Sequence, residues 1–163
     1  MYKFLSIYLI ISLVSCSNYY PKNLRHLLQA ENLTKHEKYD EAFSEYELHI
    51  KTRSQQPDLQ QWENPYFYQL IIGDLQLKLK NPSAALKSYL KAEENGVSTI
   101  LVNDRIRLVA NWYESEKEYD KAINLLEKYR TRDSLMFDLM LDRLSKKIVS
   151  IQDKTSSSSD LAK

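Results

Sequence analysis

Lys38-Tyr39-Asp40-Glu41-Ala42-Phe43 occurs again, with related residues, as Glu118-Tyr119-Asp120-Lys121-Ala122-Ile123. A third version, Asn81-Pro82-Ser83-Ala84-Ala85-Leu86, lies between them. Each copy has an alanine at one site, a second small residue twelve positions earlier and a larger residue four positions later. The three sets are Ala30, Ala42 and Tyr46; Gly73, Ala85 and Tyr89; and Ala110, Ala122 and Leu126. Internal repetition on this scale is typical of proteins built from one recurring supersecondary unit.

The spacing within each set predicts a pair of closely packed helices. Small side chains at facing positions let two backbones approach, and a larger residue one turn further on packs beside them. A polar residue near the start of each second helix is a candidate N-cap, and Pro82 suits the first helical position. These candidate caps are Asp40, Asn81 and Asp120. The sequence therefore predicts three helical hairpins.

The composition favours helices along the whole chain. Two glycines and four prolines among 163 residues are too few for the frequent turns of a sheet-rich protein. Gly96 is expected to follow the end of one helix. We expect helices at residues 23–36, 40–53, 65–80, 82–94, 98–116, 120–131 and 134–152. The last of these has an apolar face made of Leu135, Leu139, Leu141 and Leu144.

The pattern of two small residues and one large residue resembles the tetratricopeptide repeat, at its eighth, twentieth and twenty-fourth positions. The resemblance covers residues 23–131 and implies an all-α solenoid of about three hairpins with a C-terminal capping helix. Equivalent alanines are 43 and 37 residues apart, against the usual 34 in that family, and an inserted loop at 55–64 fits the longer interval. The alternative is an irregular helical bundle in which the alanines recur by chance.

The first sixteen residues have the organisation of a secretory signal. Lys3 is followed by an apolar run from Phe4 to Val14, which is shorter than the about twenty residues that span a membrane. Leu13-Val14-Ser15-Cys16 resembles the lipobox of bacterial lipoproteins. That resemblance implies cleavage before Cys16, diacylglycerol on its sulfur and acylation of the new amino terminus. A buried cysteine after an ordinary signal is the alternative.

These features divide the chain into a lipoprotein signal peptide at 1–15, a lipidated tether at 16–22, a tetratricopeptide-like helical domain at 23–153 and a disordered, serine-rich tail at 154–163.

Cleavage would remove Lys3 and leave 22 basic and 22 acidic side chains. This balance argues against nucleic acid as the main partner and against a polybasic membrane patch. Ser17 after the cysteine, rather than Asp, favours an outer-membrane anchor, with the protein facing the periplasm.

No catalytic residues, metal site or cofactor are predicted, and the chain is not expected to be an enzyme. The sequence has neither a glycine-rich phosphate loop nor a nucleophile elbow. The three histidines, His26, His36 and His49, do not share a metal-ligand spacing on one helical face. Of these, His26 and His49 are expected to pack between helices. Glu114, Glu116 and Glu118 point in different directions on a helix and are expected to be solvated.

Tetratricopeptide proteins usually bind in the groove formed by the first helix of each repeat. The resemblance carries that lining over to Glu31, Lys35, Asp74, Lys78, Arg107 and Asn111. Their mixed charges favour a peptide or protein partner, although each could equally be a solvated surface residue.

An aromatic cluster either forms an interface or packs between repeats, with Phe67 and Tyr68 expected to face different sides. The cluster is Trp62, Tyr66, Phe67 and Tyr68.

A lipid-anchored array of hairpins without reactive groups is suited to holding other proteins. The chain resembles the BamD-type subunit of the outer-membrane β-barrel assembly machinery, whose repeats also begin soon after the acylated cysteine. That family usually has about five repeats, two more than this chain. The resemblance implies a scaffold lipoprotein that binds partner proteins of an envelope assembly complex. Two alternatives remain: a pilotin of a pilus secretin, and a surface-exposed lipoprotein that binds host molecules or envelope polymer.

Overall fold

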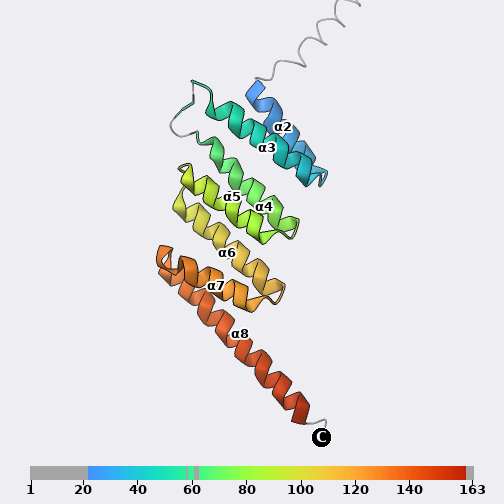
Figure 1. The fold of residues 1–163 in the computed structure, drawn as a ribbon, viewed down its shortest axis with the longest axis vertical. Helices are drawn as coiled ribbons and strands as arrows, with labels where there is room; N and C mark the ends of the chain where they lie inside the picture. Colours follow the sequence, from blue (N-terminus) through green and yellow to red (C-terminus); the bar gives the residue numbers. More distant parts are fainter. Residues whose placement is uncertain (1–21, 58, 61–62, 161–163) are drawn as a thin grey trace, which may run out of the picture. The chain divides into compact units, whose positions relative to one another are not determined.

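The computed structural model describes residues 22–57, 59–60 and 63–160. In this part of the chain the regular secondary structure consists of seven α-helices and two short 3₁₀ helices, with no strand (Figure 1). The predicted all-α class is therefore confirmed. Two compact units meet at the Pro65–Tyr66 peptide bond, and each is described by itself.

The first unit contains one helical hairpin, α2 (Lys22–Lys35) and α3 (Tyr39–Ser54), whose helices pack against each other. Ala30 and Ala42 are both fully buried, as their small size and spacing predict. Tyr46 is also buried. At the edge of this hairpin, the His26 Nδ1 atom lies 2.7 Å from the Glu45 Oε2 atom. The first predicted hairpin is thus present.

The second unit contains two further hairpins and a last helix. These are α4 (Tyr68–Lys78) with α5 (Pro82–Glu94), α6 (Thr99–Ser115) with α7 (Tyr119–Tyr129), and α8 (Ser134–Asp160). The 3₁₀ helices, Pro65–Phe67 and Arg130–Arg132, precede α4 and follow α7. Helix α6 packs on both α4 and α5, and α8 packs on α7 (Figure 1). One core joins all five helices, and its largest fully buried side chains include Leu70, Tyr89, Ile106, Leu126, Phe137 and Leu144.

The three hairpin turns share one backbone conformation. Each has a charged residue in the left-handed region, with φ of 59° at Glu37, 58° at Lys80 and 62° at Lys117. In each turn the next residue donates its N–H to a carbonyl five residues back. These bonds are Lys38 to Leu33 (2.9 Å), Asn81 to Gln76 (2.9 Å) and Glu118 to Tyr113 (2.8 Å). The sequence repeat is therefore also a repeat of local structure.

The ends of the helices confirm some predicted caps and correct others. Asn81 caps α5, since its side-chain oxygen accepts the Ala84 N–H at 3.2 Å. Gly96, at φ 86°, follows the end of the same helix as predicted. Asp40 and Asp120 are not N-caps, because α3 and α7 begin one residue earlier, directly after their left-handed turns. Both carboxylates instead lie in the first helical turn, where the helix dipole favours negative charge.

The predicted apolar face of the last helix is only partly correct. Phe137 and Leu144 of α8 are fully buried, whereas Leu135 and Leu139 are 70% and 56% exposed. Each of the two exposed leucines is two residues from Phe137, which places it roughly 200° away around the helix. Helix α8 also continues to Asp160, past the predicted start of the disordered tail at residue 154. Propagation of an existing helix adds one hydrogen bond per residue and needs no new nucleus.

Candidate functional site

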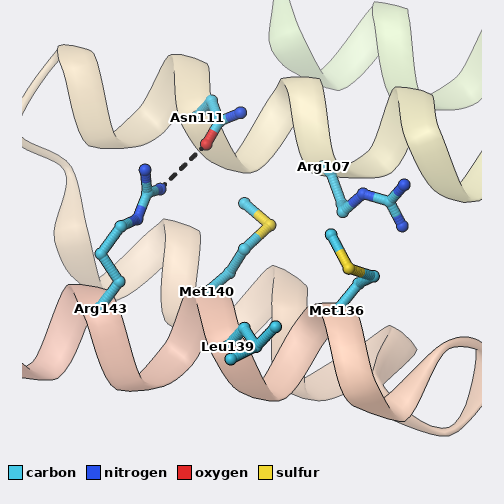
Figure 2. Close-up of a pocket in the computed structure, with 6 residues that line it drawn as sticks. All are labelled: Arg107, Asn111, Met136, Leu139, Met140 and Arg143. Carbon is cyan, nitrogen blue, oxygen red and sulfur yellow. Dashed lines mark hydrogen bonds between the residues drawn. The ribbon is translucent and has the colours of Figure 1, made fainter.

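A groove of about 310 Å³ lies between α6 and α8. We call it the α6–α8 groove. In Figure 2 the two methionine side chains extend from α8 towards α6, and Leu139 lies on the near side of α8. The lining residues are Arg107 and Asn111 from α6, and Met136, Leu139, Met140 and Arg143 from α8.

The groove follows from how α8 is seated on α7. Phe137 and Leu144 point into the core, so the neighbouring stripe of α8 faces α6. That stripe is Met136, Met140 and Arg143, with the four- and three-residue spacing of one helix face. Helix α6 presents residues spaced by four, Arg107 and Asn111, towards it. The two stripes face each other but leave Met136 40% exposed.

Arg107, at one end of the groove, is already paired with carboxylates. It donates to Asp104, three residues earlier on α6, and to Asp133 at 2.8 Å. Asp133 directly precedes α8, so this ion pair helps to fix where that helix begins. A guanidinium with two carboxylate partners has little charge left to attract an acidic ligand.

Arg143, at the other end, belongs to a second network. Its guanidinium donates to the Asn111 side-chain oxygen at 3.1 Å and to Glu114 at 2.5 Å, and Lys147 donates to Glu114 at 2.9 Å. Glu114 was predicted to be solvated, but its side chain is only 12% exposed. The prediction fails because α8 brings two cations against the end of α6.

The chemistry of the α6–α8 groove suits binding rather than catalysis. Its floor is the flexible, polarisable surface of Met136 and Met140, which adapts to differently shaped apolar partners. Leu139 adds exposed apolar area, and the charges of the two ion-pair networks balance when taken together. Such a surface fits apolar side chains from a helix or an extended segment of another protein.

The predicted groove residues have different environments. Arg107 and Asn111 line the α6–α8 groove, and Lys78 is exposed on α4. Glu31 and Lys35 are exposed on α2, in the first unit. Asp74 is half-buried and makes contacts within the second unit. Cys16 lies outside the described residues.

Asp74 connects three helices of the second unit. Its Oδ1 atom accepts the hydroxyl of Tyr89 on α5 at 2.8 Å and the Nε–H of Arg105 on α6 at 2.9 Å. Burial raises the pKa of Tyr89, and the negative charge of Asp74 raises it further. This predicted groove residue therefore has a structural role.

We expect the stability gained from Tyr89 to be lost at high pH. Tyr89 ionises near pH 10 in the unfolded chain, whereas in the folded chain it keeps its proton. Its contribution to the unfolding free energy is therefore complete below about pH 10 and falls above it by about 1.4 kcal/mol per pH unit. Urea unfolding of wild type and Tyr89→Phe between about pH 9 and 11 would measure this. The free-energy advantage of wild type should shrink as the pH rises. A constant difference would contradict the assignment.

Sequence patterns did not identify the α8 half of the groove. Met136, Met140 and Arg143 carry no motif, and Leu139 was assigned to the apolar face that packs inward. Phe137 is the bulkiest apolar residue of this segment. Counting helical turns from Phe137 is the one sequence signal that separates the inward face of α8 from its exposed face. Leu135 and Leu139 form a second apolar stripe on the same helix, so the sequence offers two candidate inward faces.

Other residues singled out in the sequence have structural roles. His49 is buried, as predicted, and His26 is half-buried beside Glu45, while His36 is exposed. In the ranges that the structure describes, no three potential metal ligands gather. Phe67 is 45% exposed and Tyr68 half-buried, with their rings edge to face at 6.4 Å. Tyr66 packs against the core of the second unit, and Trp62 lies outside the described residues.

No protein-family model and no curated protein matches this chain. Within the described residues, no helix combines the length and the apolar character that crossing a bilayer requires.

Proposed function

We propose that this chain is a lipid-anchored scaffold that binds an apolar segment of a partner protein in the α6–α8 groove. The observation that carries the proposal is the exposed apolar surface of Met136 and Leu139 beside charges that are already paired. Large side chains left exposed in a groove between well-packed helices favour a protein-binding site.

The arrangement of the hairpins supports a tetratricopeptide-like scaffold. All nine positions of the small–small–large pattern are buried, and the three hairpin turns are alike. In the second unit, α6 packs on both helices of the preceding hairpin, as a following repeat does. Repeats of this kind present extended binding surfaces and need no reactive groups.

The anchor and its setting are inferred from the sequence. Leu13-Val14-Ser15-Cys16 followed by Ser17 supports lipidation at Cys16 and a periplasm-facing position at the outer membrane. Helical repeats soon after an acylated cysteine resemble the BamD-type lipoproteins. We therefore propose that the partners belong to an envelope assembly complex, with the β-barrel assembly machinery as the first candidate.

Replacing Leu139 by glutamate should remove partner binding and leave the fold intact. A carboxylate at residue 139 would replace an apolar contact with a hydrated charge, so we expect at least about tenfold less partner to be recovered. Leu139 is largely exposed, so the unfolding free energy should change by no more than about 0.5 kcal/mol. The measurement is crosslinking in native membranes followed by affinity purification and mass spectrometry.

Val149→Glu is the matched control, because Val149 is 55% exposed on the same helix and does not line the groove. It should retain the partner. Equal recovery with Leu139→Glu and wild type would refute the groove as the binding site. Recovery of cytosolic proteins alone would refute the envelope setting, and rapid digestion of the protein on intact cells would favour a surface-exposed lipoprotein.

A further inference from the structure

A second groove, of about 380 Å³, lies between α5 and α7. We call it the α5–α7 groove. Its floor contains Leu86 and Leu90, one turn apart on α5, together with Tyr129 in the last turn of α7. Leu86 and Tyr129 are partly buried against the core. The floor is thus apolar and recessed.

Basic side chains surround this floor. Lys87 and Lys91 form a row on α5 beside the two leucines, and Lys128 approaches from α7. The only acidic residue among those lining the groove is Glu94. In the described part of the chain, neither Lys87 nor Lys128 has a carboxylate within ion-pair distance; the Lys128 ammonium lies 5.3 Å from the centre of the Tyr129 ring. The α5–α7 groove therefore has a local surplus of positive charge.

This surplus distinguishes the two grooves of the second unit. In the α6–α8 groove, Arg107 and Arg143 are each held by carboxylates. In the α5–α7 groove, Lys87 and Lys128 have no such carboxylate among the described residues, and Lys87 is also repelled by Lys91, one helical turn further on. A ligand that brings negative charge relieves this repulsion, and an apolar side chain on the same ligand covers the leucines and the tyrosine.

We propose that the α5–α7 groove binds an acidic peptide segment of a second protein. Carboxylates of the segment pair with Lys87 and Lys128, and an aliphatic or aromatic side chain between them contacts Leu90 and Tyr129. A single inserted side chain reaches a recessed floor, whereas the flat surface of an anionic bilayer meets only the lysines. This site goes beyond the proposed scaffold function and shares no lining residue with the α6–α8 groove.

The test measures fluorescence anisotropy with the full chain in detergent micelles. The probe is a short fluorescein-labelled peptide in which glutamates flank a Leu-Phe pair; the comparison peptide has lysines in place of the glutamates. We expect binding of the acidic peptide only. Affinity should fall as NaCl rises from about 0.1 M to 1 M, because the screening length shortens from about 10 Å to about 3 Å.

Charge reversal at the two unpaired lysines, Lys87→Glu with Lys128→Glu, should weaken binding by on the order of tenfold or more. The neutral pair Lys87→Gln with Lys128→Gln should give a smaller loss and guards against misfolding of the reversed variant. Two controls should bind as wild type does: Lys51→Glu, on α3 in the first unit, and Leu139→Glu, in the α6–α8 groove.

Three results would overturn the proposal. The first is unchanged affinity in both double variants. The second is equal binding of the lysine peptide. The third is lysine-dependent binding to phosphatidylglycerol vesicles without any binding of the acidic peptide, which would assign the groove to a membrane surface. Because Leu139→Glu reports on the other groove, failure here is distinguishable from failure of the proposed scaffold function.

Discussion

Replacing Gly73 by alanine should destabilise the second unit by about 2 kcal/mol, although alanine is the better helix former. A Cβ atom at residue 73 would lie within 2.7 Å of three atoms of the Tyr89 ring. That ring is fully buried and tied to Asp74 through its hydroxyl, so it cannot move aside freely. Overpacking of this kind costs up to about 3 kcal/mol, and helix propensity returns about 1 kcal/mol. Thermal unfolding followed by circular dichroism should show a midpoint lower by roughly 10 °C.

A second substitution tests whether the close contact is the cause. The third hairpin has Ala110 and Leu126 at the equivalent positions, and both are buried. Gly73→Ala combined with Tyr89→Leu imitates that pair and should be more stable than the sum of the two single changes predicts. If Gly73→Ala alone is as stable as wild type, α4 and α5 do not approach as closely as described.

Replacing Cys16 by alanine should release almost all of the protein from the membrane. The lipobox interpretation attaches several acyl chains at this one residue, and buried acyl chains contribute about 0.8 kcal/mol per CH₂. Without them, the balanced charge of the mature chain offers no basic surplus to hold it at anionic lipid. We expect the membrane-bound fraction after an alkaline wash to fall by more than about 100-fold. Cell fractionation with palmitate labelling measures both the location and the modification.

Ser17→Ala is the control for this experiment, because it keeps the cysteine and should remain labelled and membrane-bound. Label that persists in Cys16→Ala would place the modification elsewhere. Wild-type protein that begins at Met1 and carries no lipid would refute both the anchor and the proposed envelope setting. Since the α6–α8 groove is independent of the anchor, released Cys16→Ala protein should still bind the partner in solution.

Local signals were enough to predict most of the helices. Helix α5 has the predicted bounds of 82 and 94, because Asn81 and Pro82 mark its start and Gly96 lies just after its end. The nine buried positions of the repeat followed from spacing alone. Asp40 and Asp120 were misassigned as caps because nothing in the sequence indicates that charged, non-glycine residues adopt the left-handed turn conformation before them.

The candidate site was harder to predict than the helices around it. Arg107 and Asn111 were assigned by resemblance to a groove along the first helices of the repeats, and in the structure they line a groove that the last helix, α8, completes. Their partners on α8 are 25 or more residues away in sequence. No pattern over that distance indicates that Arg143 meets Asn111, or that Glu114 receives two cations.

The amino-acid pattern alone was sufficient for the helical class, the three hairpins and the positions at which their helices approach. Those features depend on hydrogen bonds and side-chain spacings within a few turns of one chain segment. Packing in three dimensions was needed to show which face of α8 turns inward, and hence where the α6–α8 groove lies. A helix with two apolar stripes can bury either one, and only contact with α7, through Phe137 and Leu144, selects between them.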